Sequence, residues 1–261
     1  MPSRRADPRA RSRGNRGRPP RSASLSVAGR HSVLEAIEAG RAREIVVDPS
    51  HRAAARDVVT AAEAAGVPVR LSDATGGEPD GVVARLFAPA AITERELAHR
   101  DYSEDAVVVV LDGITDPQNL GAAARSAEAA GAALLVTRDH RSAPTTSAAV
   151  RASAGALLHL PVARIANIPR ALSRLQEAGF TVVGLDAHAP QTIYDAPAPE
   201  GRIVLAIGAE DRGLSRLVRE RCDELRSLPM RGSIASLNAS AALAAALFGF
   251  VLPSRSPRSG R

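Results

Sequence analysis

The alternation of apolar and polar residues divides the chain into two blocks of helices and strands. In the first block, residues 29–40 and 51–65 carry apolar positions at helical spacing, and short apolar runs at 44–47, 67–71 and 81–87 are typical of strands. These elements predict a small α/β domain over residues 25–88. Residues 89–105 combine a proline with polar and charged side chains, which indicates a linker with about one helical turn.

The second block, residues 106–252, opens with a continuous apolar run at 106–112, as expected for a strand buried on both faces of a parallel sheet. Further strands are predicted at 133–137, 157–162, 181–186 and 202–208, and helices at 119–130, 145–155, 168–178 and 213–221. Strands alternating with helices predict a doubly wound parallel α/β sheet. Residues 238–250 are apolar almost all round, which predicts a buried helix at the end of the block.

The basic residues are concentrated at the two ends of the chain. Residues 1–24 contain eight arginines and one aspartate, and residues 253–261 contain three arginines and no acid. The body between them therefore has 23 basic and 27 acidic residues, a net charge of −4. Both ends are rich in Arg, Pro, Ser and Gly, so they are predicted to be disordered arms. Such arms suit a polyanion such as RNA, although a solvated end without a required role has the same composition.

The residue counts exclude several classes of site. The chain has no lysine, which excludes a Schiff-base or P-loop lysine. Cys222 is the only cysteine and the six histidines are scattered, so we expect no disulfide within the chain and no metal site. There is no GxGxxG fingerprint for a nicotinamide cofactor. Without a long apolar stretch or a secretory signal, we expect no membrane span and a cytoplasmic protein.

Ligands of open α/β sheets bind at the carboxyl ends of the strands, which directs attention to the segments that follow them. In residues 111–131, Asn119 is predicted to cap the next helix, and Gly121 with its alanine neighbours allows close approach of a backbone or a ligand. Arg125 stands among alanines and needs an anionic or carbonyl partner. A plain helix cap and a structural ion pair would explain this segment equally well.

A second segment, residues 203–218, ends a strand in Gly208 and continues to Glu210 and Gly213. The two glycines bracket a loop whose backbone can approach a ligand closely, and Glu210 falls at the predicted crevice. A simple turn with Glu210 near a helix start is the alternative.

In a third segment, residues 228–250, Ser236 and Asn238 stand where the apolar helix begins. Their side chains can cap that helix or bind a polar group of a ligand. Taken alone, the segment favours neither role.

Together the sequences NLGAAAR (119–125), GAEDRGL (208–214) and PMRGSIASLNASAA (229–242) resemble the three motifs of the SpoU/TrmH family of RNA ribose 2′-O-methyltransferases. The first block, with AGRHSVLEAI (28–37) and GVVARL (81–86), is similar to the RNA-binding domain of those family members that methylate a guanosine of 23S ribosomal RNA. That small domain resembles the L30e/L7Ae fold. The resemblance covers residues 27–251 and leaves out only the two ends.

The resemblance implies a catalytic domain with a trefoil knot at residues 106–252, preceded by the L30e/L7Ae-like substrate-binding domain. It implies S-adenosylmethionine as cofactor, RNA and a second copy of the chain as partners, and no metal and no DNA. Cofactor contacts would fall on Leu185, Gly208, Leu228 and Leu237, and catalytic roles on Asn119, Arg125, Glu210, Ser236 and Asn238.

The sequence departs from the family pattern at two places. Ala239 and Ala241 stand where the third motif usually has valines, which removes methyl groups but no polar group. Pro79 and Asp80 replace a histidine–glutamine pair in the predicted substrate domain, so the RNA target is less well defined.

The resemblance also suggests roles for the motif residues. Arg125 would activate the ribose hydroxyl or position a phosphate, and Asn119 would orient Arg125 or the ribose. Glu210 would hold Arg125 or the third motif, whose Ser236 and Asn238 would shape the cofactor loop. Besides 23S ribosomal RNA guanosine, the alternatives are transfer RNA, the ribosomal adenosine whose methylation blocks thiopeptide antibiotics, and a non-catalytic RNA-binding protein.

Overall fold

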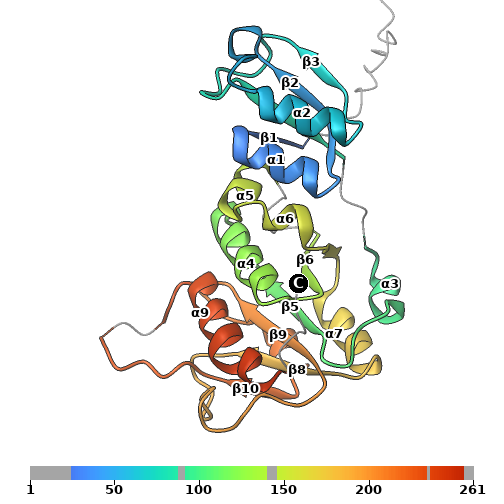
Figure 1. The fold of residues 1–261 in the computed structure, drawn as a ribbon. Helices are drawn as coiled ribbons and strands as arrows, with labels where there is room; N and C mark the ends of the chain where they lie inside the picture. The colour runs from blue at the N-terminus through green and yellow to red at the C-terminus, as the bar shows by residue number, and fades with distance from the viewer. Residues whose placement is uncertain (1–24, 88–91, 140–145, 234–235, 256–261) are drawn as a thin grey trace, which may run out of the picture.

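The first predicted block forms a four-stranded sheet with the order β1-β4-β2-β3. Figure 1 shows this block with α1 and α2 beside its strands. The structure is a computed structural model that describes residues 25–87, 92–139, 146–233 and 236–255. The block consists of β1 (Ser26–Ala28), α1 (Arg30–Glu38), β2 (Ala42–Val47), η1 (Pro49–His51), α2 (Arg56–Ala64), β3 (Val69–Leu71) and β4 (Val82–Leu86). Both predicted helices and all three predicted strands are present; β2 begins two residues earlier than expected, and the other four elements are shorter than expected. The three-residue strand β1 was not predicted.

The second block forms a six-stranded sheet, entirely parallel, with the order β10-β8-β9-β5-β6-β7. Its strands are β5 (Val107–Asp112), β6 (Leu134–Arg138), β7 (Val162–Ile165), β8 (Phe180–Leu185), β9 (Arg202–Gly208) and β10 (Glu224–Arg226). All six residues of β5 are buried, as its apolar run predicts. The expected parallel α/β sheet is confirmed.

Helices cover both faces of this sheet and form two separate apolar cores. On one face lie α4 (Pro117–Ala129) and α9 (Ala239–Ala246), together with α5 (Ser147–Ala152) and α6 (Ala156–His159). On the other lie α3 (Glu94–His99), α7 (Ile168–Glu177) and α8 (Arg216–Arg219). Gly121 of α4 lies so close to α5 that a Cβ atom there would be 2.5 Å from Ala152 Cβ. The predicted close approach at Gly121 is therefore made by another helix.

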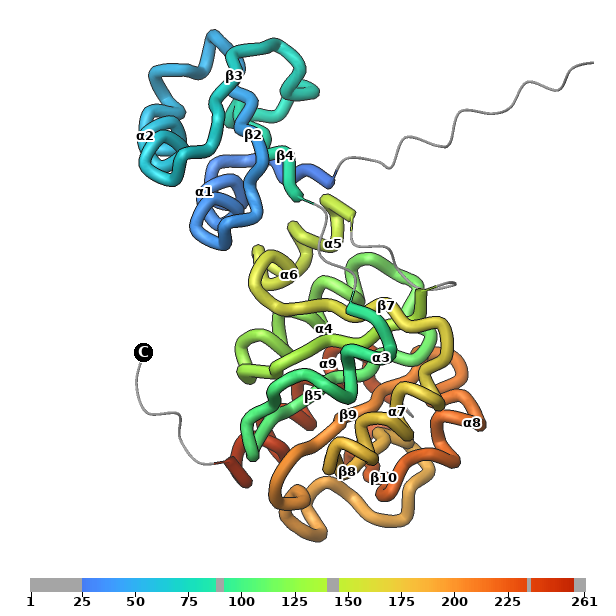
Figure 2. Tube along the Cα trace, turned by 90° about the vertical axis from the view of Figure 1, so that its right-hand side faces the viewer, coloured from blue at the N-terminus to red at the C-terminus, as the bar shows by residue number. Residues whose placement is uncertain are grey.

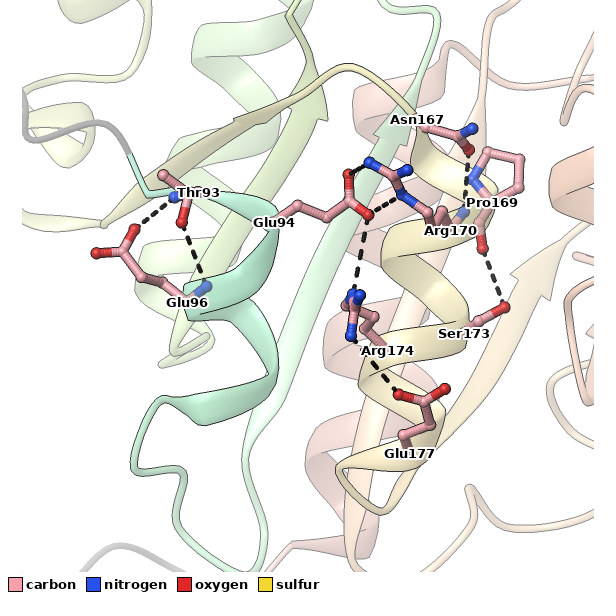
Figure 3. A network of polar contacts seen from close by, with 9 residues as sticks. All are labelled: Thr93, Glu94, Glu96, Asn167, Pro169, Arg170, Ser173, Arg174 and Glu177. Atoms are coloured by element: carbon pink, nitrogen blue, oxygen red, sulfur yellow. Dashed lines mark hydrogen bonds and ion pairs between the residues drawn. The ribbon is translucent and has the colours of Figure 1, made fainter.

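Helix α3 lies inside the predicted linker and is fastened to α7 (Figure 3). A capping box starts it: Thr93 N donates to Glu96 Oε2 at 2.6 Å, and Glu96 N donates to Thr93 Oγ1 at 3.3 Å. Glu94 accepts two hydrogen bonds from the Arg170 guanidinium, one of them from Nη2 at 2.8 Å. Leu97 is fully buried in the core beneath α7. The second half of the linker thus belongs structurally to the larger sheet.

The strand predicted at 157–162 is wrong except at its last residue. Residues Ala156–His159 form α6, and the strand β7 starts only at Val162. A short apolar run fits a buried helix or a buried strand equally well. Gly155, with φ +85°, reverses the chain before it, and Leu157 N donates to Ser153 Oγ at 3.2 Å. These local bonds favour the helical turn.

The predicted C-terminal helix is buried on one face only. It runs through α9 into the π-helix η2 (Leu247–Val251), and Leu243 and Leu247 are fully buried. Ala241 and Phe248 face outward, and Phe248 is 49% exposed. An apolar face of this segment therefore remains uncovered within the single chain.

The predicted disordered C-terminal tail begins too early at residue 253. Residues Leu252–Ser254 form one 3-10 turn, η3, in which Ala198 N donates to Ser254 Oγ at 3.2 Å. Arg255 donates to the carbonyl oxygen of Gly201. Residues 256–261 and the predicted N-terminal arm, residues 1–24, lie outside the described residues.

The two sheets meet where α1 packs against the α5–α6 corner, seen in both the ribbon and the turned view (Figure 2). Glu35 Oε2 lies 3.0 Å from His159 Nε2, and Arg41 Nε donates to the Leu158 carbonyl oxygen at 3.0 Å. A Cβ at Gly155 would lie 3.2 Å from Glu35 Oε2, so the corner closely accommodates this carboxylate. The smaller sheet therefore rests on the helices that support α4.

Candidate active site

A cavity of about 390 Å³ opens at the carboxyl ends of β8 and β9. Its wall includes Leu185 at the end of β8, Gly208 at the end of β9, and Leu228 and Leu237 from the segments that follow β10. All four residues predicted to contact the cofactor therefore share one cavity. Pockets for small molecules typically measure about 300–1,000 Å³ and combine apolar walls with a few polar groups.

The loop after β9 folds back onto the end of its own strand. Gly213 N donates to the Ala209 carbonyl oxygen at 2.7 Å, and Gly213 has φ +64°. A Cβ atom at Gly208 would lie 1.9 Å from the carbonyl carbon of Gly213, which no side chain can tolerate. The two glycines that the sequence singled out are thus required for the loop itself. The fold-back places Glu210 at the edge of the cavity.

Asn238 joins the three predicted motifs. Its Oδ1 accepts hydrogen bonds from Ser240 N at 2.9 Å and from Ser240 Oγ at 2.6 Å, so it caps α9, one of the two roles considered for it. Its Nδ2 donates to Asn119 Oδ1 at 2.9 Å and to Glu210 Oε1 at 3.3 Å. Residues 119, 210 and 238 are far apart in the chain and come together in one hydrogen-bonded group.

Asn119 does not cap α4, contrary to the prediction. Asp116 is the cap, because Pro117 takes the first helical position and Gln118 N donates to Asp116 Oδ1 at 3.0 Å. Asn119 lies in the first turn of the helix. Its carboxamide oxygen is therefore available to Asn238.

Two other catalytic candidates are placed differently. Arg125 is exposed on α4, and no described residue forms a hydrogen bond or ion pair with its side chain. The partner that the sequence predicts for Arg125 is thus not found within the described part of this chain, and Glu210 contacts Asn238 instead. Ser236 is exposed and lines the cavity.

Asp112 lies opposite Gly208 at the end of β5, and the sequence reasoning did not assign it a role. It ends β5, is 3% exposed, and accepts from Arg138 Nη2 and from Ser215 N, both at 2.8 Å. It thereby ties the strand before the first motif to the segment after the second. The sequence could have indicated this role, because Asp112 is a carboxylate at the end of an otherwise apolar run.

Cys222 plays no part in the cavity. Burial raises the pKa of its thiol to about 12, with the nearby Asp223 and Asp186 carboxylates adding to the effect, and its Sγ donates to the Val218 carbonyl oxygen at 3.3 Å. A thiol in this state is not a nucleophile near neutral pH.

Within the described ranges, no group of three histidine, cysteine, aspartate or glutamate side chains could hold a metal ion. No helix among the described residues is long and apolar enough to span a membrane.

Comparison with known proteins gives the same assignment from independent sequences. Residues 106–248 match the family model described as the SpoU rRNA Methylase family. The chain is 41% identical over 198 residues to the 23S rRNA (guanosine-2′-O-)-methyltransferase RlmB of Yersinia pestis, covering 72% of this chain and 80% of that protein. It is 37% identical over 199 residues to RlmB of Escherichia coli K12, covering 73% and 82%.

Among solved structures, the chain is similar to the SpoU methyltransferase AviRb from Streptomyces viridochromogenes in complex with AdoMet. The TM-score is 0.75 at 28% identity, and the match covers 87% of this chain and 89% of that one. The match extends well beyond residues 106–248, so the first block has a counterpart in that structure as well.

Proposed function

This chain belongs to the SpoU rRNA methylase family, and on that premise we propose that it methylates the 2′-hydroxyl of a guanosine ribose in 23S ribosomal RNA. It uses S-adenosylmethionine as methyl donor. The observation that carries the proposal is the hydrogen-bonded group of Asn119, Asn238 and Glu210 at the edge of the cavity. Because ribosomal RNA is the proposed substrate, we assign the enzyme to the cytoplasm.

The cavity fits the cofactor in size and in chemistry. Leu185, Ile207 and Leu228 offer apolar walls to a purine, and carboxylates and guanidinium groups stand around them for the amino-acid part. Asp186 is fixed at this wall, since its Oδ1 accepts from His188 N at 2.8 Å and its Oδ2 lies 3.1 Å from Arg219 Nη1.

When bound, S-adenosylmethionine supplies a methyl group on a sulfonium, already activated for in-line transfer. The chain has to hold a ribose hydroxyl in line with that group and assist the loss of its proton. We assign Glu210 and Asn119 to holding Asn238, and with it the cofactor loop. Arg125 remains free to bind the phosphate beside the target ribose and to steer the hydroxyl. A guanidinium is effectively always charged, which suits this role better than that of a general base.

We further propose a homodimer in which Arg125 serves the cavity of the partner subunit. Arg125 does not line the cavity of its own chain. The uncovered apolar face of α9 and η2 supports an interface, because Phe248 is 49% exposed and Tyr194 beside Gly249 is 67% exposed. Burying such a face against a second copy would remove it from water.

The trefoil knot and the role of the smaller sheet also belong to this proposal. After β10 at the sheet edge, the chain returns to pack α9 on α4, a path compatible with the family's knot. We assign the first block to RNA binding with an L30e/L7Ae-like fold, and residues 1–24, with eight arginines, to phosphate contacts.

The direct test is methyl transfer from labelled S-adenosylmethionine to transcribed 23S ribosomal RNA and to total transfer RNA, with nuclease mapping of the label. We expect 2′-O-methylguanosine in 23S ribosomal RNA. Label on adenosine would replace the proposal with the thiopeptide-resistance type, and label on transfer RNA with a transfer-RNA enzyme. If the protein binds the cofactor but labels neither RNA, then neither free 23S ribosomal RNA nor free transfer RNA is its substrate.

The role of Arg125 has a separate test. We expect Arg125→Ala to abolish methyl transfer and to leave cofactor binding nearly intact, because the residue lies outside the cavity of its own chain. Calorimetric titration with S-adenosylhomocysteine measures the second quantity. Equal loss of transfer and binding would contradict this role for Arg125.

A further inference from the structure

One arginine in the cavity wall is almost completely buried and only partly satisfied. Arg226 ends β10 beside Leu185 of β8, lines the cavity, and is 5% exposed. Its Nε and Nη2 donate to Glu224 Oε2 at 3.1 and 2.6 Å. Its Nη1 is buried and has no hydrogen-bond partner among the described residues. A buried polar group without a partner costs free energy, so this donor is suited to a bound ligand.

The surroundings of Arg226 indicate what kind of acceptor fits. The guanidinium lies 6.0 Å from the centre of the Phe250 ring, and Glu224 balances its charge. A second carboxylate would leave this buried site with a net negative charge, which is costly in a low-dielectric environment. The apolar walls at Leu185 and Leu228 are suited to a flat aromatic ring. A neutral acceptor on such a ring satisfies both conditions.

We propose that Arg226 binds the purine of the cofactor by donating a hydrogen bond from Nη1 to a ring nitrogen. This inference rests on the proposed function, since it assigns a purine-reading side chain to the same cavity. Arg226 is a binding residue in this assignment, and the other two arginines of the wall differ from it. Arg219 is fixed by Asp186, and Arg212 is exposed.

The test is calorimetric titration of wild type and Arg226→Met with two probes, S-adenosylhomocysteine and 5′-methylthioadenosine. Both probes carry the adenine, but only the first carries the amino-acid carboxylate. We expect Arg226→Met to weaken both by a similar factor, about tenfold or more for the loss of a hydrogen bond from a charged donor. Arg226→Gln retains a shorter amide donor, so its affinity for each probe should lie between those of wild type and Arg226→Met. Arg216→Met removes an exposed arginine outside the cavity and is the matched control.

The outcomes separate the two proposals. Unchanged affinity for both probes in a folded Arg226→Met variant would overturn the inference and leave the proposed function standing. If Arg226→Met binds S-adenosylhomocysteine more weakly but 5′-methylthioadenosine as well as wild type does, Arg226 contacts the amino-acid carboxylate, and the inference is overturned. If wild type binds neither probe, the proposed function fails as well. Thermal denaturation of each variant checks folding, and the glutamine variant decides the question if the methionine variant does not fold.

Discussion

At the scale of single residues, the side chain of Asn238 caps α9 through its oxygen and donates to Asn119 and Glu210 through its nitrogen, and substitution can separate these two roles. Asn238→Asp keeps the oxygen that caps α9 but loses the donor to Asn119 and brings a second carboxylate next to Glu210. We expect at least about a tenfold slower methyl transfer, because the group that joins the three motifs is broken. The melting temperature should change little. Initial rates with 23S ribosomal RNA and thermal denaturation measure the two effects.

Two further variants calibrate this result. Asn238→Ala loses the cap as well, so it should also cost about 1 kcal/mol of stability. Ser240→Ala removes only a hydroxyl that donates to Asn238 Oδ1, and should retain most of the activity. An Asn238→Asp enzyme as fast as wild type would show that the link to Asn119 and Glu210 is structural only.

The sequence predicted individual residues well where the deciding partner lies nearby in the chain. A helix cap was one of the two roles considered for Asn238, and its side chain accepts hydrogen bonds from residues two and three positions ahead. Asn119 was misassigned because Asp116 before Pro117 is the better cap, and its true partner is 119 positions away. Contacts at that separation do not follow from local pattern. The family resemblance suggested the contact of Glu210 with the third motif as one of two alternatives, and it did not suggest the contact between Asn119 and Asn238.

At the scale of elements, the contact between α3 and α7 predicts a dependence of stability on pH. The hydrogen bonds from Arg170 hold the pKa of the Glu94 carboxyl below its usual range. The ionised form is thus favoured in the folded state, and the resulting stabilisation is present above the unfolded pKa of about 4.3 and is lost as pH falls through the folded pKa. We expect Glu94→Gln to be about 0.5–1 kcal/mol less stable at pH 7.

Denaturant unfolding at a series of pH values between 7 and 3 tests this expectation. The difference in unfolding free energy between wild type and Glu94→Gln should shrink as the carboxyl becomes protonated. Glu177→Gln at the end of α7 is the control, since Glu177 is 70% exposed and reaches Arg174 only at 4.0 Å. If the difference in unfolding free energy stays constant down to pH 3, packing and not the charge of Glu94 stabilises the contact between α3 and α7.

Elements were predictable in proportion to their length and apolar content. The strand at 106–112 is a long apolar run and was found within one residue. The strands Ser26–Ala28 and Glu224–Arg226 have three residues each, too few to show a period, and were missed. Glu224 and Arg226 are charged residues, which in a sequence indicate an exposed segment. Arg226 is nevertheless buried by its neighbours in the fold. Arg226, the residue of greatest interest there, could therefore be found only from the structure.

At the scale of the whole molecule, the separation between Arg125 and the cavity of its own chain predicts complementation between inactive variants. Arg125→Ala keeps an intact cavity. Gly208→Val keeps Arg125 but destroys the loop, because a Cβ at this position collides with the Gly213 backbone. If each cavity works with Arg125 of the partner subunit, a mixed dimer contains one complete site. Each variant alone contains none.

The expected yield of that experiment follows from symmetry. Random mixing of equal amounts makes half of the dimers mixed, each with one complete site out of two, so the mixture should regain about a quarter of wild-type methyl transfer. Phe248→Glu places a charge on the exposed apolar face and should abolish both dimerisation and the regained activity, as sedimentation and rate measurements would show. A mixture that stays inactive while mixed dimers form would mean that Arg125 serves its own chain. That outcome would require α4 to move toward the cavity when RNA binds.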